Sequence, residues 1–207
     1  MGSPEYAEAT QPSGVVETIH LEHIPSTHTV HMALFKEVTN SEFLQQQLLK
    51  RNAEFEYAFI DATSVVSRFQ LLAAAYKAIT VQQGGNMKTP NVHSEIVCSL
   101  SPNNNISEAY RRFGITAATQ SLIIIKVLVT PPSTRSAGTI EQHLLAHVHG
   151  IPTPLTDAAL RSVTDWPKVR KYYKLNGVGY LDGVKDEAFR RGEMEVLVLE
   201  GMALRNL

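Results

Sequence analysis

The chain has 207 residues, of which 43% are hydrophobic and 19% charged, and this suits one globular domain with a sizeable core. Its 19 basic and 20 acidic residues nearly cancel, which excludes a strong overall field for holding nucleic acid or an anionic membrane. The single cysteine, Cys98, excludes an internal disulfide and a zinc site made of several thiolates.

We expect a soluble protein of a reducing, intracellular compartment. No apolar run approaches the roughly 18 residues that span a bilayer, and the start of the chain is polar where a signal peptide would be apolar. Residues 1–14 have no periodic pattern and predict a flexible arm. Residues 15–207 are expected to form a single domain.

Two strands open the expected domain. Residues 17–24 and 29–35 alternate polar and apolar residues on either side of Pro25, which predicts an antiparallel pair. Residues 39–52 place leucines at helical spacing behind a capping asparagine or serine, which predicts a short amphipathic helix. The apolar run 57–61 predicts a buried strand.

The clearest helical pattern follows that strand and ends at Gly84 and Gly85. Its apolar residues recur at intervals of four, three, four and three, which predicts one stripe facing the core. The expected stripe consists of Val65, Phe69, Leu72, Tyr76 and Ile79.

The middle of the chain predicts a fourth strand, a helix and a fifth strand. Residues 93–100 alternate in polarity, so we expect a strand in which Cys98 faces the core and is inert. In the helix that follows, Asn105 is the expected cap and Gly114 the expected left-handed exit. Residues 122–129 are almost continuous in branched aliphatics, as a central strand is.

The last third of the chain is mostly helical in pattern. A surface loop over 131–138 precedes a helix that stops at Gly150, and Pro152 and Pro154 predict a turn. Residues 155–173 predict two short helices, and an amphipathic stretch runs to the end. The order of these elements predicts an α+β fold, a mixed and largely antiparallel sheet flanked by helices.

Catalytic patterns are weak. His143 and His147 lie one helical turn apart and would suit a metal-dependent enzyme, but no third ligand follows at a recognisable spacing. The glycines Gly177 and Gly179 complete no phosphate-binding loop, and no nucleophile elbow is present. The alternative to metal binding is that these histidines are ordinary surface or partly buried residues.

Basic residues gather in two places. Arg111 and Arg112 end a helix, and the segment KVRKYYK, residues 168–174, interleaves cations with Tyr172 and Tyr173. Cations beside aromatic rings bind single-stranded RNA through phosphates and stacking. The alternative to RNA binding is that Arg111 and Arg112 interact favourably with the dipole at the end of their helix, and that the segment 168–174 is a solvated helix face.

A longer pattern resembles a known family. The strings SRFQLLAAAYKAI, MKT, HSEIVCSLSPNNNISEAYRRFGI and SLIIIKV occur in this order between about residues 66 and 130. Together they resemble the PRPK-binding protein family, the small subunit of the KEOPS (EKC) complex, and its fungal members in particular. The string SPNNNISEA is the specific part of this resemblance.

The resemblance implies a subunit with no active site and no cofactor, acting in the nucleus and cytoplasm. Such subunits bind and regulate an atypical PRPK/Bud-type kinase subunit, and through it meet the tRNA threonylcarbamoyltransferase subunit. They help to recruit tRNA by its 3′ CCA end for threonylcarbamoyladenosine synthesis, and a telomere role is attributed to the complex. No membrane partner is implied.

Two sets of contact residues follow as expectations. The exposed basic and amide side chains of the resembling region are candidates for tRNA binding: Lys77, Lys88, Asn103, Asn104, Arg111 and Arg112. The terminal helical region has more apolar residues than one narrow face can bury, a surplus typical of a protein interface. We therefore expect kinase contacts at Leu181, Val184, Phe189, Leu197, Val198 and Leu204, although burial of both helix faces in the fold is the alternative.

Overall fold

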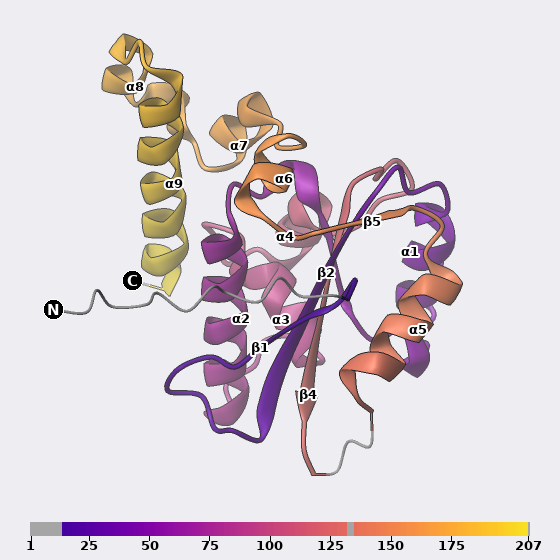
Figure 1. Ribbon diagram of the computed structural model, residues 1–207. Helices are drawn as coiled ribbons and strands as arrows, with labels where there is room; N and C mark the ends of the chain where they lie inside the picture. The colour runs from indigo at the N-terminus through magenta and orange to yellow at the C-terminus, as the bar shows by residue number, and fades with distance from the viewer. Residues whose placement is uncertain (1–13, 132–134, 207) are drawn as a thin grey trace, which may run out of the picture.

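The computed structural model of the protein describes residues 14–131 and 135–206, and of Asn206 only the backbone. The expected arm over residues 1–14 therefore lies almost wholly outside the described residues. The rest forms one α+β domain in which two helical layers enclose a central sheet (Figure 1). In the described part of the chain, no helix is both long enough and apolar enough to cross a membrane.

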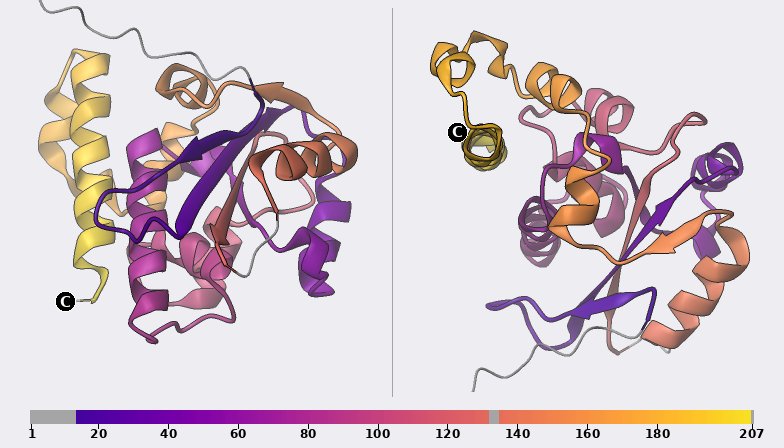
Figure 2. Two further views of the ribbon diagram at one scale, coloured as in Figure 1. Left: turned by 60° about the horizontal axis from the view of Figure 1, so that its bottom comes forward. Right: turned by 45° about the horizontal axis from the view of Figure 1, so that its top comes forward.

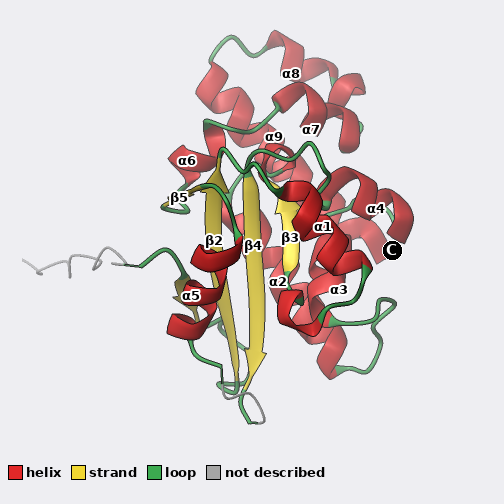
Figure 3. Ribbon diagram, turned by 90° about the vertical axis from the view of Figure 1, so that its right-hand side faces the viewer, coloured by secondary structure: helices red, strands yellow, loops and turns green. Residues whose placement is uncertain are grey.

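The sheet has the order β1-β2-β4-β3, and β5 extends it beside β2 (Figure 3). Its strands are β1 (Glu17–Ile19), β2 (His28–Lys36), β3 (Ala58–Asp61), β4 (Leu122–Val129) and β5 (Ile151–Thr153). All pairings among these strands are antiparallel, so the expected largely antiparallel sheet is confirmed. The β2–β4 ladder is the longest, from His28 opposite Val129 to Phe35 opposite Leu122.

Both faces of the sheet are buried because successive side chains of β2 and β4 point to opposite sides and nearly all are apolar. Leu34 and Ile125 belong to the core on one face, whereas Phe35 and Ile124 belong to the core on the other. This explains why residues 122–129 show no polar alternation in the sequence.

The helices divide between the two faces. On one face lie α1 (Ser41–Leu49) and α5 (Ala137–His147), whose Leu44 and Leu144 are buried there. The other face is covered by the remaining helices, which pack in several tiers (Figure 2). These are α2 (Arg68–Gln83), α3 (Val92–Ser99), α4 (Ile106–Phe113), α6 (Asp157–Arg161), α7 (Trp166–Tyr172), α8 (Gly179–Gly183) and α9 (Glu187–Ala203). Short 3-10 turns lie between or after the elements: η1 (Ala53–Phe55), η2 (Ala62–Ser64), η3 (Leu175–Gly177) and η4 (Leu204–Asn206). Of these, η1 contributes Phe55 to the core on the face of α1 and α5.

The expected strand over residues 93–100 is wrong, because this segment is the helix α3. Asn91 caps it, with the backbone N–H of Ser94 donating to the Asn91 side chain at 2.8 Å. Nearly every residue of α3 is buried, including Glu95 and Cys98, so the helix has no polar face. Without an exposed polar face, the apolar residues show no 3.6-residue period, and their short alternation with polar residues resembled the pattern of a strand. Burial raises the pKa of the Cys98 thiol to about 11, which agrees with an inert cysteine.

The core-facing stripe expected along α2 is only partly correct, because Val65 and Ile79 are buried in the core but Phe69 and Tyr76 are not. Phe69 is 61% exposed and Tyr76 is 41% exposed, whereas Ala74, Ala75 and Ala78 are fully buried. The alanines bring α2 close to its neighbours, and the large residues turn outward. Two aromatic side chains on the outer face of α2 therefore need a different explanation.

Two expected turns take other conformations. Gly114 is extended, with φ −74° and ψ 163°, and a Cβ there would lie 2.7 Å from the carbonyl oxygen of Tyr110. Close packing, not a left-handed exit, thus requires glycine. The segment of Pro152, where a turn was expected, is the edge strand β5, in which proline is tolerated because one side of the strand is unpaired.

Candidate functional site

The terminal helix α9 lies alongside α2 and carries α8 at its far end (Figures 1 and 2). Asp186 caps it by accepting a hydrogen bond from the N–H of Phe189 at 3.0 Å. Met194, Val198 and Met202 are buried, one helical turn apart from each other. The inner face of α9 is therefore a single narrow row of residues.

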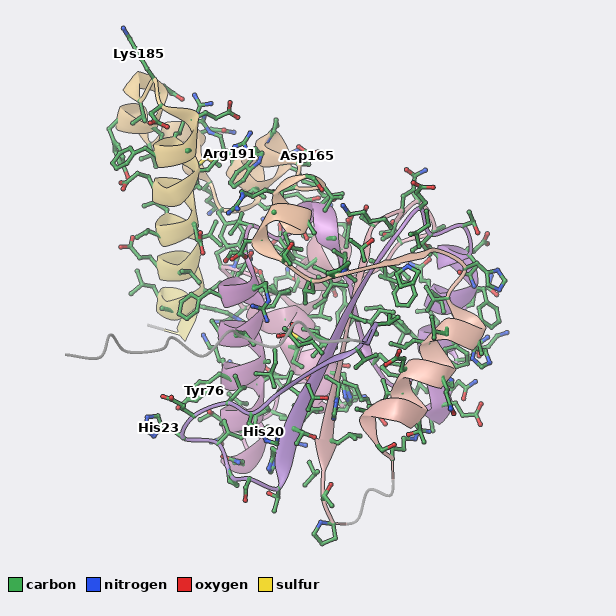
Figure 4. All side chains as sticks on the ribbon, in the orientation of Figure 1. His20, His23, Tyr76, Asp165, Lys185 and Arg191 are labelled. Atoms are coloured by element: carbon green, nitrogen blue, oxygen red, sulfur yellow. The ribbon has the colours of Figure 1, made fainter. Side chains whose placement is uncertain are left out.

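Apolar residues also lie on the outer face of α9. Phe189 is 59% exposed and Val196 is 51% exposed, and seven residues separate them, so both project to the same side. Leu204, just after the helix, is 59% exposed. Arg191 lies over the Trp166 ring, 5.2 Å from its centre, and joins α9 to α7 (Figure 4). The helix is thus held on one side and has an apolar strip on the other.

The residues expected to contact a kinase fall into three groups. Phe189 and Leu204 are exposed, and Val184 and Leu197 are half-buried. Leu181 and Val198 are fully buried in the core, which corrects the expectation that they belong to the apolar surplus. Val196, Leu199, Met202 and Ala203 recur at helical spacing in the sequence, which would suit a core-facing stripe, but only Met202 of these is buried.

A cluster of polar contacts, which we call the terminal junction, fastens the end of α9. It comprises Lys77, Asn104, Arg205 and the backbone that they bind. Lys77 Nζ donates to the carbonyl oxygen of Met202 at 2.9 Å, and Asn104 Nδ2 donates to that of Arg205 at 3.0 Å. Arg205 in turn donates to Asn104 Oδ1 at 3.0 Å and to the carbonyl oxygen of Cys98. The loop between α3 and α4 thereby holds the last turn of the chain.

The three asparagines of SPNNNISEA have different structural roles. Asn103 donates to Glu108 Oε2 at 2.8 Å and closes the loop by accepting from the N–H of Asn105 at 3.0 Å. Asn105 caps α4 as predicted, accepting from the N–H of Glu108 at 3.0 Å. Asn104 belongs to the terminal junction. Asn103 and Asn104 therefore already have partners inside the domain.

The six residues expected to contact tRNA are not equally available. Lys88 and Arg111 are exposed. Arg112 is only half-buried, but it pairs with Glu108, donates to the carbonyl oxygen of Tyr172 at 2.9 Å and lies over the Tyr172 ring. Lys77 is occupied in the terminal junction, and burial lowers its pKa. The expectation that Lys77 and Arg112 are exposed is therefore wrong.

The basic segment 168–174 is likewise largely used within the fold. Lys168 pairs with Asp61 at 2.7 Å, and Arg170 pairs with Asp182 at 2.7 Å. Tyr173 is buried, accepts from Gln70 Nε2 at 2.8 Å and donates to the carbonyl oxygen of Leu100. The spacing of cations and rings in this segment is thus explained mainly by packing.

His143 and His147 stack on each other, with ring centres 4.4 Å apart. His143 Nδ1 shares a hydrogen bond with the Tyr57 hydroxyl at 3.1 Å, and His147 Nδ1 lies 2.9 Å from the carbonyl oxygen of His143. Within residues 14–131 and 135–206, no group of three or more His, Cys, Asp or Glu side chains is arranged to hold a metal ion. The pair packs against Phe55 as part of an aromatic cluster.

His93, which the sequence did not single out, is the most deeply buried histidine. Its Nε2 accepts the N–H of Val127 in β4 at 3.0 Å, so it completes the edge of that strand where β3 has ended. Burial lowers its pKa, and burial also lowers the pKa values of His31 and His143. At these sites the folded state binds protons less readily than the unfolded chain.

We expect the free energy of unfolding to fall as the pH is lowered through the ordinary histidine range. The stabilisation is fully present above about pH 6.5 and is lost below it, by at most about 1.4 kcal/mol per pH unit for each histidine. Urea unfolding between about pH 7.5 and about pH 5.5 measures this slope. His93→Gln, which keeps an acceptor for Val127, should flatten it, whereas the exposed His149→Gln should not. Equal slopes in both variants would contradict the role of His93.

Comparisons with known proteins agree with the resemblance in the sequence. The model of the family "Kinase binding protein CGI-121" matches residues 35–206. The chain is 52% identical to the EKC/KEOPS complex subunit CGI121 of Gibberella zeae, over 93% of this chain and 99% of that protein. It is 48% identical to the protein of that name from Neurospora crassa, with the same coverage, and 29% identical to the one from Schizosaccharomyces pombe, over 71% of this chain and 82% of that protein.

Proposed function

This chain belongs to the kinase binding protein CGI-121 family, and we propose that it is a non-catalytic EKC/KEOPS subunit that binds an atypical kinase through the outer face of α9. The apolar strip of Phe189 and Val196 is the observation that supports this location. Exposed aromatic and aliphatic residues grouped on one helix face are typical of protein interfaces. A kinase partner accounts for why they stay exposed in the isolated chain.

The neighbouring helix supports an extension of this surface. Phe69 and Tyr76 lie seven residues apart on the outer face of α2, and α2 runs beside α9 (Figures 1 and 4). An interface of ordinary size needs about 800 Å² from each partner. Two adjacent helices supply such an area more readily than one.

Size-exclusion chromatography with the kinase subunit from the same organism tests the proposal. We expect co-elution at micromolar concentration, and no kinase, ATPase or hydrolase turnover from this chain alone. Separate elution of the two proteins would contradict kinase binding. Turnover that depends on added zinc or iron would favour the metal-dependent enzyme with His143 and His147.

We also propose that the chain helps to recruit tRNA by its 3′ CCA end, for threonylcarbamoyladenosine synthesis in the nucleus and cytoplasm. The family resemblance motivates this role, and the exposed cations Lys88 and Arg111 are suitable phosphate partners. A telomere role of the complex and a link to the threonylcarbamoyltransferase subunit through the kinase belong to the same proposal.

Charge removal at Lys88 and Arg111 tests this tRNA contact. In Lys88→Ala and Arg111→Ala, the dependence of log K on log salt should become shallower by about 1 for each phosphate that is no longer neutralised. The thermal midpoint should stay unchanged because both side chains are exposed. Binding measured against a tRNA without its CCA end is the control. If the salt dependence equals that of the unsubstituted chain, Lys88 and Arg111 do not contact tRNA and are ordinary solvent-exposed residues.

A further inference from the structure

A cavity of about 340 Å³ opens beside β4, at the place where β3 has ended. β3 pairs with residues 122–125 of β4, so within the described residues Val127 and Val129 have no strand neighbour on that side. None of the described residues that line the cavity belongs to α9. Its polar lining includes Glu56, Gln82, Asn91, His93, Lys126 and Arg135.

His93 directs a hydrogen-bond donor into this cavity. Because Nε2 accepts the N–H of Val127, the neutral ring carries its proton on Nδ1. Among the described residues Nδ1 has no hydrogen-bond partner, and Glu56 Oε1, at 3.5 Å, is at the outer limit of such a bond. The ring is 4% exposed, so an unmet donor here is costly.

A second lining residue, Gln82, has a buried acceptor atom. Gln82 Oε1 has no hydrogen-bond partner in the described part of the chain. It lies on α2, whereas His93 lies on α3, so the two helices contribute complementary groups. A ligand that satisfies both must carry an acceptor and a donor.

The charges around the cavity have both signs. Lys126 donates to the backbone carbonyl of Glu56, and burial lowers its pKa to about 8 although the Glu56 carboxylate raises it. Arg135 is a second cation of the lining, and Glu56 is the single carboxylate. A lysine beside a carboxylate favours a ligand with a carboxylate of its own and a nearby positive or N–H group.

We propose that this cavity binds an α-carboxylate flanked by an N–H donor. The carboxylate accepts from His93 Nδ1 and neutralises Lys126, while the N–H group donates to Gln82 Oε1 and faces Glu56. Two sources have this chemistry, a free amino acid and the C-terminal residue of a peptide. A phosphate fits less well because Gln82 and Glu56 present it only with acceptors.

Nuclear magnetic resonance of the full ¹⁵N-labelled chain tests the site through the Val127 amide, whose N–H is bonded to His93. The probes are glycine, N-acetylglycine, acetamide and inorganic phosphate. We expect a saturable shift of the Val127 signal with glycine or N-acetylglycine in the millimolar range and none with acetamide. Gln82→Leu should weaken binding about fivefold, the loss of one hydrogen bond. Its exposed neighbour Gln83→Leu is the matched control and should bind normally.

The outcomes separate the two sources. Tighter binding of N-acetylglycine supports a peptide C-terminus, and tighter binding of glycine supports a free amino acid. The proposal is overturned if neither probe shifts Val127, if phosphate binds as well as they do, or if Gln82→Leu and Gln83→Leu behave alike. No step depends on the kinase, so failure of this site and failure of the proposed function are independent results.

Discussion

Replacing Phe189 by Glu should weaken kinase binding at least roughly 30-fold, which corresponds to about 2 kcal/mol. The substitution places a charge in an interface that excludes water, where the charge loses its hydration at a high cost. Because the Phe189 side chain is 59% exposed, the monomer should fold normally. Val196→Glu should act in the same way, since it lies on the same strip. Isothermal titration calorimetry with the kinase subunit measures both effects.

A matched substitution separates this surface from a general effect of added charge. Ile151, on the edge strand β5, is 52% exposed and lies away from α9 (Figure 1). Ile151→Glu should bind the kinase with unchanged affinity. Equal losses in Phe189→Glu and Ile151→Glu, or no loss in either, would show that α9 is not the interface.

Arg205→Ala should lower the free energy of unfolding by about 2–4 kcal/mol. Arg205 is 9% exposed, and its removal leaves Asn104 Oδ1 and the carbonyl oxygen of Cys98 without this donor. Hydrogen bonds to a charged group contribute about 1.5–3 kcal/mol each, and they are not fully additive. Chemical denaturation measures the change, and amide hydrogen exchange should show faster opening near Met202.

Arg111→Ala is the control for this junction, because Arg111 is exposed and its pair with Glu108 spans 3.6 Å. Exposed pairs contribute about 0–1 kcal/mol. The junction would lose its assigned role if the two arginine variants were equally stable. Asn104→Ala should reproduce part of the Arg205→Ala effect, and the double variant should cost less than the sum of the two.

The sequence predicted those elements whose pattern depends only on residues close together in the chain. The strand at residues 122–129 and the Asn105 cap of α4 were predicted correctly, because a run of branched aliphatics and a helix cap are both features of neighbouring residues in sequence. Helix α3 was missed because burial on every side removes its period. In α2 three of the buried residues are alanines, and a scale that rewards large apolar residues places Phe69 and Tyr76 in the core instead.

The candidate sites depend on contacts that no local pattern contains. Lys77 meets Met202 across 125 residues of the chain, and Asn104 meets Arg205 across 101. These partners decide which polar residues remain available, so the expected tRNA set could not be narrowed from the sequence. Phe189 and Leu204 were named because the terminal region has more apolar residues than one helix face can bury, and both side chains are exposed. His93 was missed since its partner, the N–H of Val127, is a backbone group.

The β2–β4 ladder joins residues 28–35 to residues 122–129, and this separation has a consequence for synthesis on the ribosome. Translation at about 5–20 residues per second leaves β2 without its partner for several seconds or longer. During that time the apolar run of β2, from Val30 to Phe35, is exposed to other nascent chains and to chaperones. Long-range pairing of this kind also slows folding, because a large loop must close before the contacts form. Production of the protein should therefore depend on the chaperone capacity of the host more than the stability of the finished domain would suggest.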